Sequence, residues 1–294
     1  MNRSDVIPIL FLILMMAVSL PVFLNPPLYL MIIMLILYVV MFFGFVITHG
    51  KQVLGLGGIS VFFGITALVT YAMEWLGTHF GVPFGHYYYT NQLGPLIMDV
   101  PIVIPFQWFN TLYVCYIMAY IILGKRDIVE GGQDSGASED SKFSGKISRI
   151  FATSIVAGLF MTLWDSINDP YMVGMGNWVW TEPMEFFGLA FAGIPLSNFL
   201  GWVLTSALTV FLFDLYRYRN QGSIRLTVDV VAEPRNGLVV IPYLYLLVFQ
   251  ATNGITAGVF SFETPVGWAP IALAAVSMVI AVILVAWRYL KSRS

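Results

Sequence analysis

The chain has 294 residues, of which 59% are hydrophobic and 10% are charged, and its formal net charge at pH 7 is −2. A mean hydropathy of +0.82 is typical of a helix bundle embedded in a lipid bilayer and excludes an ordinary soluble domain. No basic patch with interleaved aromatic residues is present, so no nucleic-acid partner is expected. The single cysteine, Cys115, excludes an intramolecular disulfide and a cysteine-cluster metal site.

Eight apolar runs follow one another along the chain, and each is about 17–25 residues long, the length at which a helix crosses roughly 30 Å of hydrocarbon. The first run follows Arg3 as a signal peptide would, but it continues without a polar region, so we interpret it as a helix. The sequence therefore predicts an all-α fold, a polytopic transmembrane helix bundle of about eight spans that forms a single domain over residues 1–294. The runs are Val6–Leu24, Leu28–Thr48, Val53–Trp75, Val100–Leu123, Ile147–Ile167, Ile194–Phe213, Leu238–Phe260 and Pro270–Trp287.

All fourteen Lys and Arg residues fall on one side of the predicted bundle. They lie near the two ends of the chain or in and beside alternate connections, and the other four connections contain no Lys or Arg. Because positive residues accumulate on the cytoplasmic side of a membrane, we predict that both termini are cytoplasmic. The protein is thus expected to be a multi-pass protein of the cell membrane, with its chemistry on the extracytoplasmic side.

One cytoplasmic connection contains the stretch Glu130–Gly145, which is rich in Gly, Ser, Asp and Glu and has almost no apolar residues. Such a stretch cannot bury enough surface to offset the entropy of ordering, so it is predicted to be a disordered, mobile loop. Nothing in it indicates chemistry. The outer connections therefore carry the candidate functional residues.

The outer connections after the third and fifth runs are rich in aromatic residues. Tyr and Trp favour the membrane interface, so one interpretation is an aromatic belt. The other is the rim of a pocket or a lid over a hydrophobic ligand, with Gly and Pro fixing the turns. Each connection is followed by a helix that opens with a short Pro motif, which is a weak indication of an internal repeat. The two motifs are Asp99-Val100-Pro101-Ile102 and Gly193-Ile194-Pro195-Leu196.

Seven carboxyl groups lie at or near the outer side, with no Lys or Arg beside them. Ionisable groups at membrane depth are costly and face a cavity or a partner, so a functional site is the default hypothesis. Asp99 precedes a predicted helix, where capping is a sufficient explanation, and two of the glutamates fit a first helical turn in the same way. The seven are Glu74, Asp99, Asp165, Asp169, Glu182, Glu185 and Glu263.

Glu74, Asp165 and Asp169 differ, because they lie at the C-terminal ends of predicted helices. There the helix dipole disfavours a negative charge by about 0.3–1 kcal/mol. Asp165 and Asp169 are four residues apart, hence on one helix face, and like charges at that spacing favour the sharing of one proton. A carboxyl group that stays protonated near neutral pH is what a general acid requires. The alternative is that both aspartates hydrogen-bond to the outer loops or to water.

Other polar residues give weaker signals. His79 and His86 lie near Glu74, but their spacing matches no metal motif and an interfacial histidine is usually just hydrogen-bonded, so no metal is expected. Amide side chains within the spans, such as Asn198, usually form hydrogen bonds between helices. No nucleotide-binding motif is present, and no cofactor is expected.

Several motifs between about residues 50 and 260 together resemble the carotenoid biosynthesis membrane-protein family, which includes bisanhydrobacterioruberin hydratase and carotenoid 1,2-hydratases. As an ordered set the motifs are specific, whereas single ones are not. They are Glu74-x-x-Gly77, Gly81-x-Pro83-Phe84-Gly85-x-Tyr87-x-Tyr89, Val100-Pro101-x-x-Ile104-Pro105-x-x-Trp108, Trp164-Asp165-x-x-x-Asp169-Pro170, Trp178-x-Trp180 and Gly193-Ile194-Pro195-x-Ser197-Asn198-Phe199-x-Gly201-Trp202.

This resemblance implies a cofactor-independent hydratase, a hydro-lyase, that adds water to terminal double bonds of a long acyclic carotenoid of the bacterioruberin type. The implied partners are this carotenoid, the lipid bilayer and other enzymes of the carotenoid pathway. Hydration of such an alkene begins with protonation to a tertiary carbocation, which water then captures. The reaction therefore needs a neutral carboxylic acid, π-rich walls, a second polar group and an apolar tunnel.

We predict that Asp165 or Asp169 is the proton donor and that the other one acts with Glu74 as a partner or water-orienting base. Asn198 and His79 are expected to give polar support, and Asp99 completes the candidate catalytic set. Aromatic residues are expected to bind the substrate and stabilise the cation. These are Trp108, Trp178, Trp180, Tyr87, Tyr89 and Trp202.

Three alternatives stay open. Cyclisation of a carotenoid end group begins with the same protonation but ends without uptake of water. A transporter or channel would also carry intramembrane acids and helices broken by Gly and Pro, although the acids here crowd at one end of the bundle. Pigment binding without chemistry is the third. A retinal protein is excluded, because every lysine lies outside the predicted spans and none can form a Schiff base.

Overall fold

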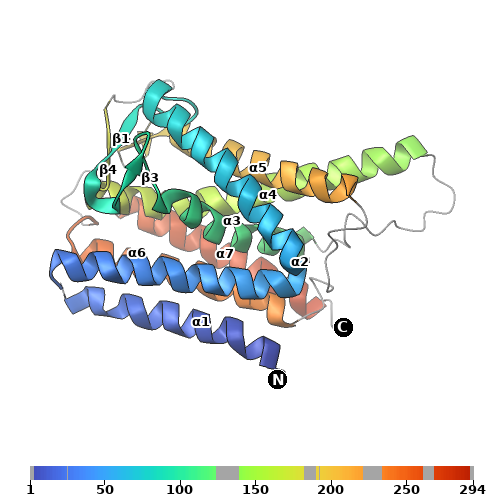
Figure 1. The fold of residues 1–294 in the computed structure, drawn as a ribbon, viewed down its shortest axis with the longest axis horizontal. Helices are drawn as coiled ribbons and strands as arrows, with labels where there is room; N and C mark the ends of the chain where they lie inside the picture. Colours follow the sequence, from blue (N-terminus) through green and yellow to red (C-terminus); the bar gives the residue numbers. More distant parts are fainter. Residues whose placement is uncertain are drawn as a thin grey trace.

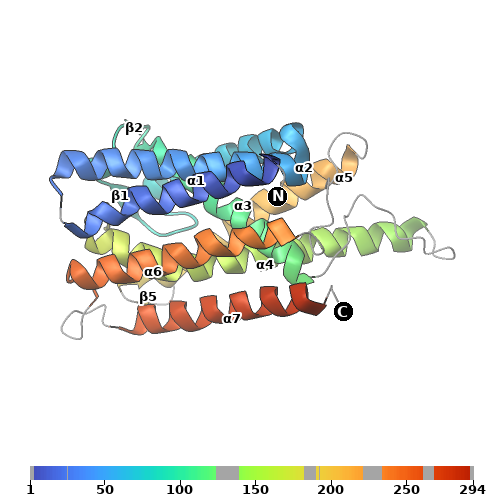
Figure 2. The ribbon, with the colours of Figure 1, turned by 90° about the horizontal axis from the view of Figure 1, so that it is seen from below.

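The computed structural model describes residues 3–24, 26–123, 139–181, 190–191, 193–220, 234–260 and 268–291. Its main elements are long helices that run along a common axis (Figures 1 and 2). These are α1 (Arg3–Ser19), α2 (Leu28–Phe80), α3 (Val103–Leu123), α4 (Glu139–Gly174), α5 (Leu196–Arg219), α6 (Val240–Thr256) and α7 (Ala269–Lys291), with the 3₁₀ helices η1 (Leu20–Leu24), η2 (Asn91–Leu93) and η3 (Pro234–Val239).

The described residues include six helices that are long and apolar enough to cross a membrane, as expected for a multi-pass membrane protein. The apolar part of α1 is shorter and covers Val6–Ser19. Each of the eight predicted runs overlaps a helix, and two of them fall on α2, which is 53 residues long. The count of eight spans and the cytoplasmic placement of the termini stay predictions.

Helix α2 accommodates two runs because it is broken at Gly55. There φ is 72° and ψ is 166°, a backbone conformation that glycine adopts readily and L side chains rarely do. A Cβ atom at Gly55 would meet nothing within 4 Å, so it is the backbone angle and not lack of space that requires glycine. On either side of the break the two parts of α2 run in opposite directions along the bundle (Figure 1).

Helix α3 forms the centre of the bundle and packs against α2, α4, α6 and α7. Of the most apolar 18-residue stretch of α3, 78% is buried inside the protein, whereas the corresponding share for α7 is 19%. A helix that is apolar all round is expected in such a central position, because no face of it can be left to water. The less buried α7 presents its remaining apolar surface outward, as a lipid-facing helix does.

Short antiparallel strands form at one end of the bundle, which the prediction of an all-α fold did not include. Strand β1 (Tyr87–Tyr89) pairs with β4 (Trp178–Trp180). Strands β2 (Leu96–Ile97) and β3 (Val100–Pro101) form a hairpin before α3, and β5 (Ala190–Phe191) pairs with β6 (Ile194–Pro195) before α5. The protein is therefore mostly helical, with β pairs at the end that carries the candidate site.

The two Pro motifs occupy equivalent positions, which strengthens the indication of an internal repeat. Each forms the second strand of a strand pair that leads directly into a helix. The register of β1 and β4 is reciprocal, because Tyr87 pairs with Trp180 and Tyr89 with Trp178 around the central pair Tyr88 and Val179. We call the second part of α2 with β1–β3 and α3 the first half, and α4 with β4–β6 and α5 the second half.

The described basic residues lie away from the strand end. They occur at the start of α1, beside the break in α2, in the first turns of α4, in η3 just before α6, and in the last turns of α5 and α7, and these segments lie at the other end in Figure 1. The predicted mobile loop, Glu130–Gly145, lies outside the described residues up to position 138. Its remainder is helical, because α4 begins at Glu139.

Candidate active site

A cavity of about 80 Å³ lies at the strand end of the bundle, between the two halves. Its walls bring together most of the side chains that the sequence singled out. Both halves contribute a carboxyl group, and both contribute aromatic rings. Nine predicted residues line it: Glu74, Tyr87, Tyr89, Trp108, Asp169, Trp178, Trp180, Asn198 and Trp202.

Glu74 is positioned in the last turns of α2, where the chain turns back toward β1. Gly77, one turn further along, allows this return, because a Cβ atom there would lie 2.9 Å from both the Phe84 and the Tyr87 rings. The close approach brings Tyr87 over the helix end and within hydrogen-bond reach of Glu74. The absence of a side chain at Gly77 therefore lets β1 pack closely enough on α2 for Tyr87 to reach Glu74.

The Glu74 carboxylate is 4% exposed and accepts hydrogen bonds from three aromatic side chains. Tyr87 and Tyr89 donate their hydroxyl protons to Oε2, the latter at 2.7 Å, and Trp108 donates its Nε1 proton to Oε1 at 2.7 Å. Burial of a carboxylate is costly unless such donors replace water. The site thus holds Glu74 as an acceptor with both oxygens occupied.

The two tyrosines remain neutral donors. Burial, and then the neighbouring Glu74 carboxylate, raises the pKa of Tyr87 well above its ordinary value near 10, and the pKa of Tyr89 rises for the same reasons. A protonated hydroxyl is what each needs in order to donate to Glu74. Both hydrogen bonds therefore persist through the physiological pH range.

Asp165 and Asp169 lie side by side, as their spacing predicts, because α4 continues through Pro170 to Gly174. The amide nitrogen of Asn198 on α5 donates to Asp165 Oδ2 at 3.1 Å and also to Asp169 Oδ2. Trp178 Nε1 donates to Asp169 Oδ1 at 2.7 Å. Both carboxyl groups are fully buried, and of the two only Asp169 lines the cavity.

Among the described residues, no Lys or Arg forms an ion pair with these acids. The walls of the cavity, as far as the structure describes them, contain no Lys, Arg or His. No group of three or more His, Cys, Asp or Glu side chains in the described part of the chain is arranged to hold a metal ion. A buried acid pair without a cation is stabilised by sharing a proton, since like charges at this distance disfavour double ionisation.

The structure does not bring His79 and Asp99 into the cavity. They contact each other, with 3.4 Å between His79 Nε2 and Asp99 Oδ2, and the Asp99 side chain is 74% exposed. Asp99 is not a helix cap, because it lies with Met98 in the turn between β2 and β3. Both residues have positive φ, 45° and 66°, as the central residues of a tight hairpin turn do. Glu182, Glu185 and Glu263 lie outside the described residues.

The aromatic walls are packed in pairs that join the two halves. Trp108 stacks on Trp202 with 4.0 Å between the ring centroids and 18° between the planes. The ring centroids of Tyr87 and Trp180 are 5.0 Å apart, and those of Tyr89 and Trp178 are 5.8 Å apart. These rings are thus more than an interfacial belt, since they form the walls of a buried cavity.

Sequence reasoning missed Asn168 and gave no role in the site to Gln107 or Trp164, although all three line the cavity. Asn168 lies three residues after Asp165 on the same helix face, a spacing that could have indicated it, and its amide nitrogen lies 3.4 Å from Asp165 Oδ1. Gln250 on α6 donates to Asn168 Oδ1 at 2.6 Å. Gln107 Oε1 and Trp164 Nε1 also belong to wall residues, and neither has a hydrogen-bond partner among the described residues.

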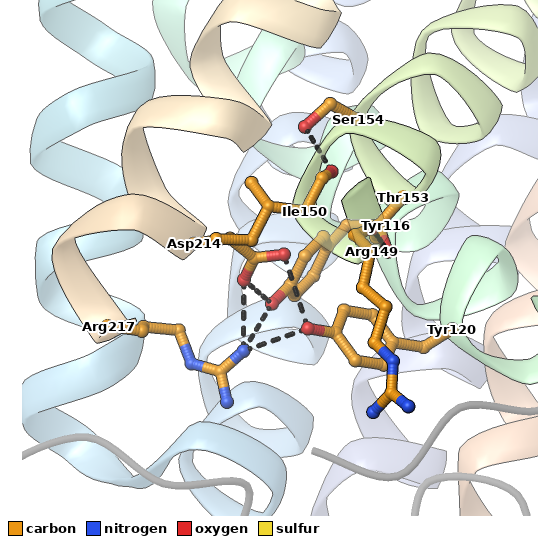
Figure 3. A network of polar contacts seen from close by, with 8 residues as sticks. All are labelled: Tyr116, Tyr120, Arg149, Ile150, Thr153, Ser154, Asp214 and Arg217. Atoms are coloured by element: carbon orange, nitrogen blue, oxygen red, sulfur yellow. Dashed lines mark hydrogen bonds and ion pairs between the residues drawn. The ribbon is translucent and has the colours of Figure 1, made fainter. Parts of the chain in front are cut away.

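A second buried polar cluster lies toward the opposite end of α5 (Figure 3). Asp214 and Arg217 form a fully buried ion pair at 2.9 Å. The hydroxyls of Tyr116 and Tyr120 donate to the two Asp214 oxygens at 2.7 and 3.2 Å and accept from Arg217 Nη1 at 2.9 and 3.1 Å. The sequence placed Arg217 in a connection after Phe213, but α5 continues to Arg219, so Arg217 lies within the bundle.

Comparison with known proteins adds the biochemical context. A family model described as "Carotenoid biosynthesis protein" matches residues 28–281. The chain is also 28% identical over 148 residues to a bisanhydrobacterioruberin hydratase from Haloarcula japonica, an alignment that covers 50% of this chain and 42% of the relative. The aligned part thus spans less than half of that protein. No solved structure matches the chain.

Proposed function

This chain belongs to the carotenoid biosynthesis protein family, and from that premise we propose that it is a hydratase acting on a terminal C=C bond of a long acyclic carotenoid. The observation that carries the proposal is a buried cavity with acids from both halves, tryptophan walls and no basic residue among its described lining. The distant similarity to a hydratase supports the same reaction. The cavity is assigned to the extracytoplasmic side, because the described Lys and Arg residues lie at the other end.

The proton donor in this proposal is Asp169. It faces the cavity, whereas Asp165 lies behind it and is joined to it through Asn198. The Asp169 proton is transferred to the less substituted alkene carbon, and the neighbouring carbon becomes a tertiary carbocation. The role of Asp165 is to keep the donor protonated before the reaction, because two neighbouring carboxyl groups resist ionising together and one proton therefore stays on the pair until the alkene takes it.

The carbocation is stabilised by π faces and by a negative charge. The stacked pair Trp108 and Trp202 presents large indole surfaces to the cavity, and a cation over an indole face is attracted to it by about 0.5–2 kcal/mol. Glu74 lines the same cavity and accepts hydrogen bonds from three donors, so we assign it as the carboxylate whose charge acts on the cation in a medium of low dielectric constant.

Water capture completes the reaction. We assign the water to Gln107 and Trp164, cavity-lining residues whose buried Oε1 and Nε1 atoms have no hydrogen-bond partner among the described residues and could accept and donate one bond. The oxygen bonds to the carbocation, and one proton of the water leaves to Glu74. One proton transfer among the acids restores the resting state, so the net change is the addition of one water molecule to one double bond.

The proposal is tested by expressing the chain in cells that make an acyclic carotenoid and measuring the carotenoid masses. A gain of one or two waters, dependent on Asp169, supports a hydratase. A product of unchanged mass with a new ring would mean a cyclase, and unchanged carotenoid bound to the protein would mean pigment binding. Either of these two results would overturn the hydratase proposal.

A further inference from the structure

A second cavity, of about 220 Å³, adjoins the active-site cavity. Its walls come from α1, η2, α3, α4, α6 and the first part of α2. The two cavities share part of their walls, so they lie on opposite sides of the same residues. The shared residues are Leu35, Leu93, Gln107, Trp164, Asn168 and Met172.

The chemistry of the second cavity indicates an uncharged, apolar ligand. None of the residues described as lining it is charged. Four methionines, Met31, Met34, Met172 and Met175, contribute flexible and polarisable surface that adapts to an irregular apolar shape. Aromatic rings from Tyr38, Tyr171 and Phe249 add apolar surface, and the polar residues of the wall are uncharged: Ser19, Gln92, Gln107, Asn168, Asn177 and Gln250.

The second cavity also reaches the outer surface of the bundle. Ile32 belongs to its wall and is 39% exposed, and its neighbour Ile33 is 48% exposed. Both lie on the first part of α2, whose exposed apolar side chains face the hydrocarbon of a bilayer. A ligand dissolved in the membrane can therefore enter this cavity sideways, without passing through water.

The small volume of the active-site cavity indicates that a long substrate also occupies a neighbouring space. Sites for small ligands usually measure about 300–1,000 Å³, so the active-site cavity alone has room only for the end of a chain. The rest of a long substrate must leave that cavity through a neighbouring space of apolar character. The second cavity is such a space, and it lies directly behind the wall that carries Trp164 and Met172.

We propose that the second cavity binds the linear isoprenoid chain of the substrate while its reacting end occupies the active-site cavity. This inference rests on the proposed function for the nature of the substrate. The site makes the enzyme selective for long chains, because a short alkene with the same end group gains nothing from the second cavity. Exchange of the chain with the membrane takes place at the side of α2 that carries Ile32.

The test compares two tryptophan substitutions at adjacent positions of α2. Met34 lines the second cavity but not the active-site cavity, so Met34→Trp fills the chain site. Ile33 is exposed and lines neither cavity, so Ile33→Trp adds the same bulk on the lipid side. Met31→Trp is a second filling variant at another wall position. Thermal unfolding of the purified full chain establishes that each variant is folded.

Binding and turnover are measured separately. Binding of lycopene, an acyclic carotenoid, is followed by quenching of tryptophan fluorescence in detergent solution. Turnover is followed with lycopene and with a two-isoprene-unit alkene that ends in the same isopropylidene group. We expect the filling variants to weaken lycopene binding by about tenfold or more while conversion of the short alkene is unchanged, and Ile33→Trp to leave both as in the parent chain.

The outcomes separate the two proposals. Parent-like lycopene binding by folded Met34→Trp and Met31→Trp would overturn the chain site, whatever the reaction is. Weakened binding by both variants, in a chain that binds lycopene but never adds water to either alkene, would support the chain site and overturn the hydratase proposal. Loss of short-alkene conversion in the filling variants would also contradict the chain site, because the active-site cavity should be untouched.

Discussion

Trp108 and Trp202 stack on each other across the boundary between the two halves, each seven residues after the proline of its own strand, Pro101 or Pro195. The two indoles differ in one respect. Trp108 donates its N–H to Glu74, which makes it the link between the aromatic wall and the acid of the first half.

This difference predicts unequal effects of two matched substitutions. Trp108→Phe keeps an aromatic ring but removes the hydrogen bond to a buried carboxylate, which is worth about 1.5–3 kcal/mol. Trp202→Phe removes a comparable amount of ring surface without a bond to Glu74. We expect Trp108→Phe to lower the hydration rate by about tenfold or more and Trp202→Phe to lower it less, as measured by initial rates of product formation. Equal losses in the two variants would contradict the assigned role of the Glu74 contact.

The assignment of Asp169 as proton donor predicts a large and specific loss. Asp169→Asn retains the shape of the side chain but has no acidic proton, so the hydration rate should fall by about 10²–10⁴-fold, the usual contribution of a general acid. Asp165→Asn should cause a smaller loss, because that residue lies behind Asp169. Asp99→Asn is the matched control, since Asp99 is exposed and should leave the rate unchanged. If both buried aspartate variants kept the parent rate, the acid pair would have no catalytic role.

The role of Gln107 in holding water predicts a change in products. Gln107→Leu removes the amide oxygen and leaves an apolar wall of similar volume, so the carbocation should form at a similar rate but meet water less often. We expect a larger share of double-bond isomers, which have the mass of the substrate and arise when the cation loses a proton instead of gaining water. Chromatography with mass detection measures this ratio. A parent-like product ratio at any overall rate would exclude Gln107 from water capture.

The buried cluster around Arg217 predicts a stability effect that is separate from catalysis. Asp214→Asn removes the carboxylate that pairs with the buried Arg217 guanidinium at 2.9 Å and should lower the free energy of unfolding by about 3–5 kcal/mol. Replacing both residues, with Asp214→Leu and Arg217→Met, removes both charges and should cost less than the single change. Arg219→Met, at an exposed position in the same turn, is the control. Thermal unfolding in detergent measures each effect, and a double variant less stable than Asp214→Asn would contradict this account.

The two active-site tyrosines predict a loss of stability at high pH. Their folded-state pKa values lie well above the value near 10 of an unfolded chain, because burial and the Glu74 carboxylate oppose ionisation. The unfolded chain therefore releases these protons first, and stability, complete below about pH 10, is lost as the pH rises through the folded-state values. Tyr87→Phe should lose less stability between about pH 9 and 11 than the parent chain. Tyr88→Phe, at an exposed position between the two, should follow the parent.

Much of the helical framework could be predicted because bilayer thickness sets the length of an apolar run. The strands could not, since pieces of two or three residues such as β2 contain no alternating pattern to detect. The sequence predicted a connection at residues 49–52, between the runs Leu28–Thr48 and Val53–Trp75, whereas the reversal occurs at Gly55, inside the second of these two runs. Nothing in the local sequence distinguishes a turn from a sharp kink at that glycine.

The acids of the site could be predicted where a physical cost made them unusual. Their position at membrane depth without a basic neighbour singled out Glu74, Asp165 and Asp169, and the structure places all three at or beside one cavity. They do not end their helices as predicted, because α2 continues to Phe80 and α4 to Gly174. The exposed position of the Asp99 side chain could not be predicted, because it depends on the hairpin turn between β2 and β3. Arg217 was assigned to a connection because the apolar run ends at Phe213, although its spacing of three residues from Asp214 already fits an ion pair within a helix.

The pairing of β1 with β4 has a consequence for how this protein tolerates change. Three residue pairs and one indole stack fix the acids of the two halves relative to each other from within the site itself. Helix α3 ends and helix α4 begins at the far end of the bundle (Figure 1), away from these contacts. Insertions and deletions between Leu123 and Glu139 should therefore leave the positions of these acids unchanged. One extra residue in β1 or β4 would instead turn the side chains that follow it to the opposite face of the strand, so that they no longer line the cavity.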